Sequence, residues 1–206
     1  MADTEYKPLR LSRLNDGAGV PQFAQFAPRP VRADSPAIEV MTDLRLVGAA
    51  TVEAEMPIDG AQQAMIARGV RSLLVVDPQA CVIGLLTARD LLGERPMQVV
   101  RERGLRHEEL RVRDIMTVRE AIEVIGIADV LRARVGHVVE TLKHSGRQHA
   151  LVVENDVVSG REYVRGIFSA SQIARQLGVA IHTTEVARTF AEIEAVLARP
   201  QLAPAR

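Results

Sequence analysis

An internal duplication constrains this chain more than any other feature. Residues 84–90 read Gly-Leu-Leu-Thr-Ala-Arg-Asp, and residues 166–172 read Gly-Ile-Phe-Ser-Ala-Ser-Gln. Two further pairs of segments recur in the same order, namely 40–42 (Val-Met-Thr) with 115–117 (Ile-Met-Thr), and 73–77 with 150–154, where an apolar run ends in an acid. Because order and spacing agree, we interpret the chain as two copies of one structural unit.

Each copy carries the signals of a mixed α and β unit. In the first, apolar residues at helical spacing predict a helix over 58–68 that ends at Gly69. Two apolar runs, 73–76 and 82–86, are joined by turn-forming residues and predict antiparallel strands, after which Thr87 opens a second helix. The repeated order gives an α+β fold of two tandem β-α-β-β-α units.

The second copy repeats these signals with small differences. Gly146 is expected to end a helix, and strands are expected at 150–153 and 163–168; the helical stripe consists of Leu131, Val135, Val138 and Leu142. Extra residues of this copy fit the turn 154–162. Between the copies, residues 90–103 predict a helix interrupted near Pro96.

The duplication divides the chain into four parts. We expect an extended arm over 1–36, because its prolines and glycines exclude regular helices, then one repeat at 37–104 and another at 105–180. Residues 181–206 are expected to form a C-terminal helix and tail. The stripe of that helix suits either a dimer interface or a cover for the chain's own core, and comprises Val186, Phe190, Ile193 and Leu197.

Composition narrows the functional classes. The 206 residues include 26 basic and 26 acidic side chains, so no overall charge attracts nucleic acid or an acidic membrane. The lone Cys81 and the scattered histidines offer no metal-ligand spacing, and we expect no metal. No signal peptide or membrane-length apolar run is evident, so a cytoplasmic protein is expected. Catalytic motifs are also lacking, so we expect no enzyme.

The ordered motifs resemble those of a CBS (cystathionine-β-synthase) domain. The likeness rests on Val-Met-Thr at 40–42, the run from Gly69 to Asp77, and the segment 84–92, and it returns in weaker form in the second copy. Two such domains in tandem resemble a Bateman module. The resemblance implies two repeats packed through their sheets with pseudo-two-fold symmetry. It also implies two clefts that accept an adenosine nucleotide (AMP, ADP or ATP) or sometimes S-adenosylmethionine.

Carried over by position, the resemblance implies a first nucleotide site that draws on both repeats: Thr87, Arg89, Asp90, Ile125, Ile127, Arg147, Gln148 and His149. Thr87 begins a helix, where free N–H groups favour an anion, and Asp90 is an acceptor for ribose hydroxyls. The two isoleucines suit a flat adenine ring, and the basic side chains suit its phosphates.

The second implied site departs from the family pattern. It comprises Arg45, Ala50, Val70, Arg71, Ser72, Ser169, Ser171 and Gln172. Gln172 stands where the family has an acid and offers one acceptor oxygen, so its hold on a ribose is expected to be weaker by about 1 to 2 kcal/mol. We therefore expect unequal sites, with this one weak or empty.

Structural alternatives stand beside both sites. The segment from Thr87 to Asp90 also fits a helix capping box, and so does the segment from Ser169 to Gln172. Arg45 and Arg71 suit phosphate binding but equally suit extension into solvent.

The leading functional hypothesis is a non-catalytic sensor that binds an adenosine nucleotide as its regulatory ligand and relays its presence to an unidentified regulated protein, itself forming a homodimer. The alternatives are a ligand-free dimeric scaffold, an S-adenosylmethionine sensor and, if turnover were found, a nucleotide-hydrolysing enzyme.

Overall fold

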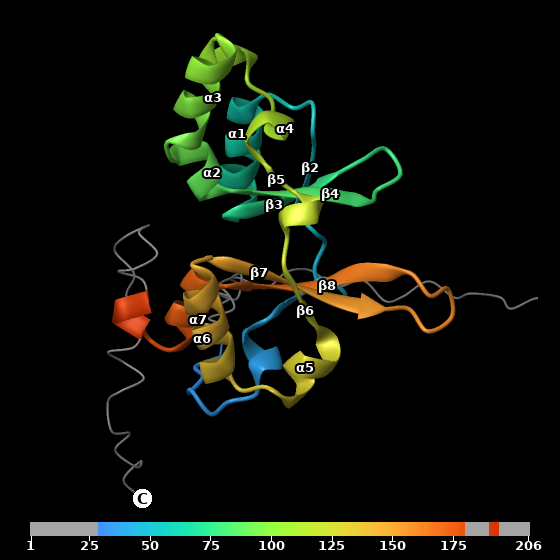
Figure 1. The fold of residues 1–206 in the computed structure, drawn as a ribbon. Helices are drawn as coiled ribbons and strands as arrows, with labels where there is room; N and C mark the ends of the chain where they lie inside the picture. The colour runs from blue at the N-terminus through green and yellow to red at the C-terminus, as the bar shows by residue number, and fades with distance from the viewer. Residues whose placement is uncertain (1–28, 180–189, 194–206) are drawn as a thin grey trace, which may run out of the picture.

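Two four-stranded sheets face each other at the centre of the molecule, and helices cover their outer faces (Figure 1). The structure is a computed structural model that describes residues 29–179 and 190–193. The upper sheet of Figure 1 has the order β2-β3-β4-β5, with strands Thr51–Glu53, Ser72–Val76, Val82–Thr87 and Thr117–Val118. The lower sheet has the order β1-β8-β7-β6, with strands Thr42–Asp43, Glu162–Ser169, His149–Asn155 and Val124–Gly126. The layers are helices, sheet, sheet and helices, which is a tandem α+β fold as predicted.

The helices of the upper half are α1 Ile58–Arg68, α2 Ala88–Leu92, α3 Arg95–Arg103, the 3-10 turn η2 His107–Glu109 and α4 Val112–Ile115. Those of the lower half are η1 Ala37–Val40, α5 Ile127–Arg132, α6 Val135–Ser145 and α7 Ala170–Gln176, and the 3-10 turn η3 Arg119–Ala121 connects the halves. The helices α1 and α6 both end at a glycine with positive φ, Gly69 and Gly146. Glycine adopts this backbone without steric cost, which explains why both helices stop there.

The two copies exchange their first strands. β1 comes from the first copy but pairs antiparallel with β8 of the second, where Thr42 lies opposite Ile167. In the symmetric arrangement, β5 of the second copy pairs with β4 of the first, with Thr117 opposite Leu85. The recurring Met-Thr motif therefore marks the strand that each copy contributes to the other copy's sheet.

A glycine in each sheet makes this exchange possible. A Cβ on Gly166 would lie 2.5 Å from Met41 Sδ, and one on Gly84 would lie 2.6 Å from Met116 Sδ. Both distances are shorter than any tolerable carbon–sulfur contact, so only glycine leaves room for the methionine of the exchanged strand. The glycine of one repeated motif and the methionine of the other thus recur because they pack together.

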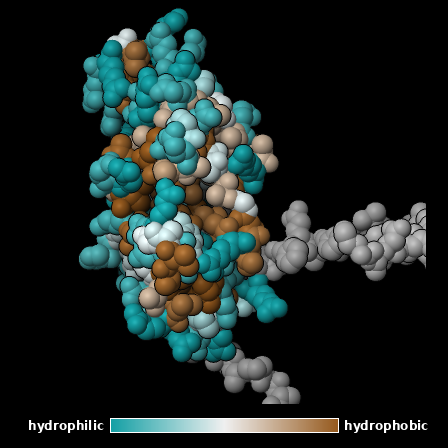
Figure 2. Space-filling view, turned by 90° about the vertical axis from the view of Figure 1, so that its right-hand side faces the viewer, coloured by the Kyte–Doolittle hydropathy of each residue, from teal (hydrophilic) through white to brown (hydrophobic). Residues whose placement is uncertain are grey.

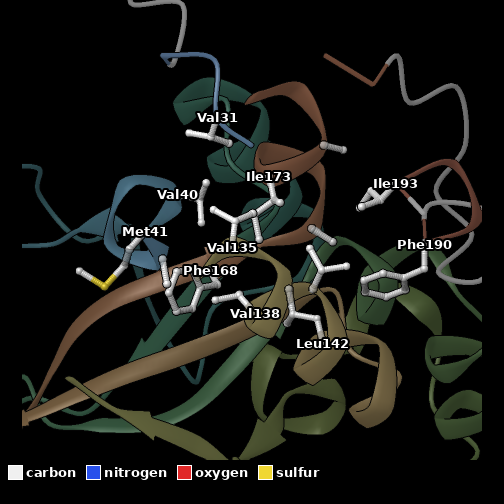
Figure 3. Close-up of a cluster of buried hydrophobic side chains, with 14 of the residues drawn as sticks. Val31, Val40, Met41, Val135, Val138, Leu142, Phe168, Ile173, Phe190 and Ile193 are labelled. Atoms are coloured by element: carbon white, nitrogen blue, oxygen red, sulfur yellow. The ribbon is translucent and has the colours of Figure 1, made fainter. Parts of the chain in front are cut away.

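Three apolar clusters hold the layers together. One lies between the sheets and is centred on Leu74, Leu85 and Leu151. A second lies under the helices of the upper half. The third fills the lower half and includes, as labelled in Figure 3, Val31, Val40, Met41, Val135, Val138, Leu142, Phe168, Ile173, Phe190 and Ile193. Each repeat buries one face of its sheet under helices and the other against its counterpart, which is why neither is expected to fold well alone.

Both ends of the described chain join the third cluster. Of the N-terminal arm, only residues 29–36 are described, and within them Val31 is buried and its N–H donates to the Gln176 carbonyl at 3.0 Å. Of the C-terminal stripe, Phe190 and Ile193 are 4% and 0% exposed and pack into the same cluster. Val186 and Leu197 lie outside the described residues. For the two described members, the core-covering alternative is confirmed.

Most local predictions are confirmed, with two corrections. The helix over 58–68 matches α1, and Thr87 is the N-cap of α2. The stripe expected from Leu131 to Leu142 is wrong as one helix, because the chain breaks between α5 and α6 and Leu131 is exposed. The break expected near Pro96 lies earlier, at Gly93 and Glu94, and Pro96 occupies the first turn of α3, where a missing N–H costs nothing.

The molecule seen from the side of the hairpin tips has a mixed surface (Figure 2). Apolar residues gather towards the middle of this face, and hydrophilic residues cover its upper end. The tip of the β7–β8 hairpin carries two exposed valines, Val157 and Val158, in a turn fixed by Asp156. This turn is the place where the sequence predicted the extra residues of the second copy.

Candidate functional site

A cleft of about 1030 Å³ opens between the two halves. The first copy supplies the segment 42–50 that crosses from β1 to β2, together with the end of α1 and the start of β3; the second copy supplies the start of β7, the end of β8 and α7. The lining residues are Thr42, Leu44, Val47, Gly48, Ala49, Ala50, Arg68, Gly69, Val70, Arg71, Ser72, His149, Ile167, Ser169, Ser171, Gln172 and Arg175. Its volume is at the upper end of the range found for small-molecule sites.

The charge of the cleft has one sign. Arg68, Arg71 and Arg175 line it, and no aspartate or glutamate among the described residues does. Among the described residues, Arg68 and Arg71 have no ion-pair partner, whereas Arg175 donates from Nε to the Ser171 carbonyl at 3.4 Å. Guanidinium groups that meet no carboxylate in a cleft are suited to an anionic ligand, above all to phosphate.

Hydroxyl and amide groups form the opposite wall. Ser169 Oγ and Ser171 Oγ lie 3.0 Å apart, and Thr42 Oγ1 donates to Gln172 Oε1 at 3.0 Å. Because its oxygen is engaged by Thr42, Gln172 offers its amide NH₂ to the cleft as a donor. Ser169 is the N-cap residue of α7 but makes no side-chain cap, so its hydroxyl remains available on this wall.

His149 lies at the base of the cleft. It is the first residue of β7, pairs with Ser169 of β8, and is only 7% exposed. No described residue forms a hydrogen bond with its ring. Burial, and secondly the positive charge of Arg71, lower the pKa of His149 to about 4, so the ring is neutral at pH 7.

The structure brings together seven of the eight residues expected at the second site, namely Ala50, Val70, Arg71, Ser72, Ser169, Ser171 and Gln172. Of the eight residues expected at the first site, His149 alone lines this cleft.

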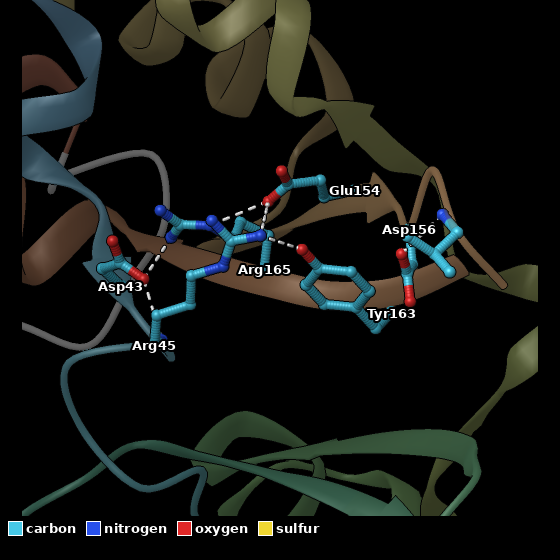
Figure 4. A network of polar contacts seen from close by, with 7 residues as sticks. Asp43, Arg45, Glu154, Asp156, Tyr163 and Arg165 are labelled. Carbon is cyan, nitrogen blue, oxygen red and sulfur yellow. Dashed lines mark hydrogen bonds and ion pairs between the residues drawn. The ribbon is translucent and has the colours of Figure 1, made fainter. Parts of the chain in front are cut away.

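The eighth residue of the second site, Arg45, lies in a polar network outside the cleft lining (Figure 4). Its guanidinium donates to the Tyr163 hydroxyl, stacks over that ring with 5.6 Å between Cζ and the ring centroid, and contacts Glu154 Oε2 at 3.0 Å. Arg165 Nε contacts the same Glu154 oxygen at 2.9 Å, and its Nη1 pairs with Asp43. The network fixes β1 and the start of the crossing segment to the lower sheet.

At the first expected site, Asp90 is engaged by its own helix. Its Oδ2 accepts from Thr87 N at 2.8 Å and from Thr87 Oγ1 at 2.7 Å, and the Asp90 N–H donates to Thr87 Oγ1 at 3.3 Å. Its second oxygen lies 3.5 Å from Arg95 Nη1. The capping box that the sequence allowed is therefore formed, and it occupies the carboxylate that a ribose would require.

The other residues of that site serve local contacts. Arg147 donates to the Ala121 carbonyl at 3.1 Å and lies 3.7 Å from Glu123. Ile125 and Ile127 pack against the lower core, and Arg89 is exposed on α2. Gln148 precedes β7, and its carbonyl accepts from Ala170 N at 2.9 Å. These positions remain a prediction from the resemblance.

Arg68 and Arg175 were not predicted in the cleft from the sequence, although the spacing of Arg175 from Ser171 indicates its position. Arg175 follows Ser171 by four residues, so both lie on one face of α7, and helical spacing from the expected serine would have found it. Arg68 closes α1 just before Gly69 and has no such signal. Thr42 joins the cleft only because β1 crosses to the other sheet, which the motif by itself does not reveal.

Comparison with known proteins identifies the family of one segment and relates the fold to solved structures. The family model described as the CBS domain matches residues 34–96. Residues 34–96 belong to the CBS-domain family. An uncharacterised conserved protein from Pyrococcus horikoshii is similar in fold, with a TM-score of 0.52 and 21% identity over 75% of this chain and 100% of that one. A CBS-domain-containing protein from Agrobacterium tumefaciens gives a TM-score of 0.50 and 20% identity over 70% and 94%.

These likenesses concern the fold. No curated protein matches the chain. The matched segment covers the first CBS repeat, and the exchanged strands and symmetric sheets show that the second half repeats its architecture, giving a tandem CBS fold. Within residues 29–179 and 190–193, no helix is long and apolar enough to cross a bilayer. The same residues contain no cluster of three or more histidine, cysteine or acidic side chains that suits a metal.

Proposed function

We propose that this CBS pair is a non-catalytic regulatory module that binds an adenosine nucleotide in the cleft between its halves. The observation that carries the proposal is the set of three arginines in a cleft to which the described part of the chain contributes no carboxylate. Such a site stabilises phosphate through charge-assisted hydrogen bonds, each worth about 1.5 to 3 kcal/mol. Val70, Ile167 and the crossing segment supply apolar wall for a purine ring.

The charge of the cleft favours a nucleotide over S-adenosylmethionine. The sulfonium of that molecule carries a positive charge next to its ribose, and the described lining of the cleft offers three guanidinium groups and no acid to receive it. ATP and ADP carry several negative charges, which match the arginines. Binding is therefore expected to weaken in the order ATP, ADP, AMP, with S-adenosylmethionine and adenosine weaker still.

The location of the cleft supports a sensing role. Its walls come from both repeats, and segment 42–50 runs along it while connecting the lower sheet to the upper sheet. A ligand that contacts both walls stabilises one arrangement of the halves over others, and a partner that prefers this arrangement then responds to the ligand. We extend the proposal to a regulated partner protein and to a homodimer as the functional unit.

Calorimetric titration of ATP, ADP, AMP, adenosine and S-adenosylmethionine tests the proposal. We expect ATP to bind. We also expect Arg71→Ala and Arg68→Ala each to lower the affinity for ATP about tenfold or more. Arg101→Ala is the control for Arg68→Ala, because both arginines are exposed in the last turn of their helices but Arg101 is not in the cleft. It should leave binding unchanged.

Three results would contradict the proposal. Absence of heat with every ligand would favour the ligand-free scaffold. Equal affinity for adenosine and ATP would show that the arginines do not bind phosphate. An equal loss in Arg68→Ala and Arg101→Ala would indicate a nonspecific charge effect rather than this cleft.

A further inference from the structure

His149 is a buried polar side chain of the cleft to which no described residue gives a hydrogen bond. Its ring is 7% exposed, lines the cleft, and forms no hydrogen bond with any described residue. The ring nitrogens are not among the side-chain atoms that are sealed off without a partner, so they can be reached from the cleft, where a ligand atom can form a hydrogen bond with them. An unpaired ring that faces a cleft therefore indicates a group that the ligand completes.

The charged groups that the described residues place in the cleft with this ring are all positive. Arg68 comes from the end of α1, Arg71 from the residues before β3, and Arg175 from α7. The neighbouring β8 contributes Ile167 and Ser169, and segment 42–50 contributes no charged group to the cleft, because Arg45 is held by Tyr163 and Glu154. Burial and the field of Arg71 lower the pKa of the ring to about 4 and keep it neutral at pH 7.

An anion in the cleft favours the protonated form of the His149 ring over the neutral form. A phosphate dianion offsets the field of Arg71 and accepts a hydrogen bond from the ring, and an opposite charge within about 4 to 6 Å favours the protonated form by about 1 to 3 pKa units. The proton comes from bulk solvent, and the resulting imidazolium gives the phosphate a fourth cationic partner. No equivalent gain is available to an uncharged ligand.

We propose that the His149 ring takes up a proton when a phosphate-bearing ligand binds in the cleft. This inference rests on the proposed function and adds a direction to it: affinity for the anion rises as pH falls. Affinity rises with acidity because a complex that binds more protons than its separated components is stabilised as pH falls. The increase begins below the pKa of the occupied state and ends near that of the empty one.

The test is the number of protons taken up when ATP binds, measured by calorimetry in two buffers of different ionisation enthalpy. From the pKa of about 4 in the empty cleft and a rise of about 1 to 3 units, we expect wild type to take up about 0.2 to 0.9 proton more than His149→Gln at pH 5.5 and about 0.1 or less at pH 8. ATP's own protonation is common to both proteins and cancels in the difference.

A second measurement does not depend on the variant. The NMR chemical shift of the His149 ring followed against pH, with and without ATP, should show a higher pKa in the complex. Binding of ATP with equal proton uptake in both proteins, or an unshifted His149 pKa, would overturn this inference alone. Absence of ATP binding at both pH values would overturn the proposed function and this inference together.

Discussion

Asp90 and Gln172 occupy the same position in the two copies, but Asp90 closes a helix cap whereas Gln172 lines the cleft. The carboxylate of Asp90 accepts from both the N–H and the hydroxyl of Thr87. Gln172 instead accepts from Thr42, and the Ser169 side chain forms no capping hydrogen bond at the start of α7. The loss of an acid, which from sequence alone indicated the weaker site, is in the structure what leaves hydroxyl and amide groups facing a cationic cleft.

This asymmetry predicts that alanine at the N-cap position lowers the free energy of unfolding more in the first copy than in the second. Thr87→Ala removes both a capping hydroxyl and the partner of Asp90, and should lower the free energy of unfolding by about 1 to 2 kcal/mol. Ser169→Ala at the matching position removes only a contact with Ser171, and should cost less than about half as much. Urea denaturation measures both, and equal losses would contradict the assignment of the two caps.

The Arg165 network predicts a second residue-scale effect. Arg165→Met removes the guanidinium that pairs with Asp43 and with Glu154 in a mostly shielded position and leaves these acids only their contacts with Arg45, so it should cost about 1 to 3 kcal/mol at pH 7. Arg132→Met, which breaks an exposed pair with Asp129, is the control and should change stability by less than about 0.5 kcal/mol.

The same network has a defined pH dependence. The hydrogen bond from Arg165 is the main cause that lowers the pKa of Asp43 below its ordinary value, although burial opposes it. Because the folded pKa is depressed, the stabilisation is complete above the unfolded value and disappears as pH falls through the folded one. Between about pH 5 and pH 2, wild type should therefore lose more stability than Arg165→Met; parallel curves would contradict the pairing.

Much of the cleft could be predicted residue by residue, because the repeated motifs place Arg71, Ser72 and Ser169 at strand and helix ends that meet. The location of Arg45 outside the cleft lining could not be predicted from the sequence. Its partners Glu154 and Tyr163 are more than a hundred residues away in the chain, and only the exchanged strand brings them together. His149 was expected to contribute to a ligand site, but the pairing of β7 with β8 decides that it faces this cleft.

At the scale of elements, α1 and the two long hairpins follow from pattern alone, whereas the exchange of β1 and β5 does not. Each exchanged strand has only two residues, too few for an alternating pattern to show which sheet it joins. The break between α5 and α6 was missed for a related reason. Leu131 fits the helical stripe in sequence, but residues 133–134 turn the chain so that it points away from the core.

The strand exchange predicts that alanine is tolerated unequally at the two repeated glycines. At Gly84, an added Cβ would meet the Thr117 carbonyl at 2.9 Å as well as Met116, and paired backbone cannot move aside. At Gly166, the three nearest atoms all belong to the flexible Met41 side chain. Both substitutions should destabilise by about 1 to 3 kcal/mol, with Gly84→Ala the more severe.

A double-mutant cycle checks the cause. Because Met41→Ala removes the atoms that an alanine at position 166 would meet, the double variant Met41→Ala/Gly166→Ala should be more stable than the sum of the single effects predicts, by about 0.5 kcal/mol or more. Additive losses would contradict the packing of Met41 against Gly166. Thermal unfolding monitored by circular dichroism gives the three values.

For the whole molecule, the duplication extends beyond the motifs first recognised. Just as α3 follows α2 and contributes Val99 to the upper core, residues 190–193 follow α7 and contribute Phe190 and Ile193 to the lower core. Ile193→Ala should therefore cost about 2 to 4 kcal/mol of unfolding free energy without altering the number of subunits measured by light scattering. Unchanged stability with a changed subunit number would assign this residue to an interface instead.

We propose that the nucleotide binds in the cleft at the second site and not at the capped helix of the first. An ATP titration followed by backbone amide NMR tests it most directly, because each residue reports separately. We predict that the largest shifts cluster at Arg71, Ser72, His149 and 169–172, while the amides of 87–90 change little. Shifts centred on 87–90, or no shifts at saturating ATP, would contradict the account.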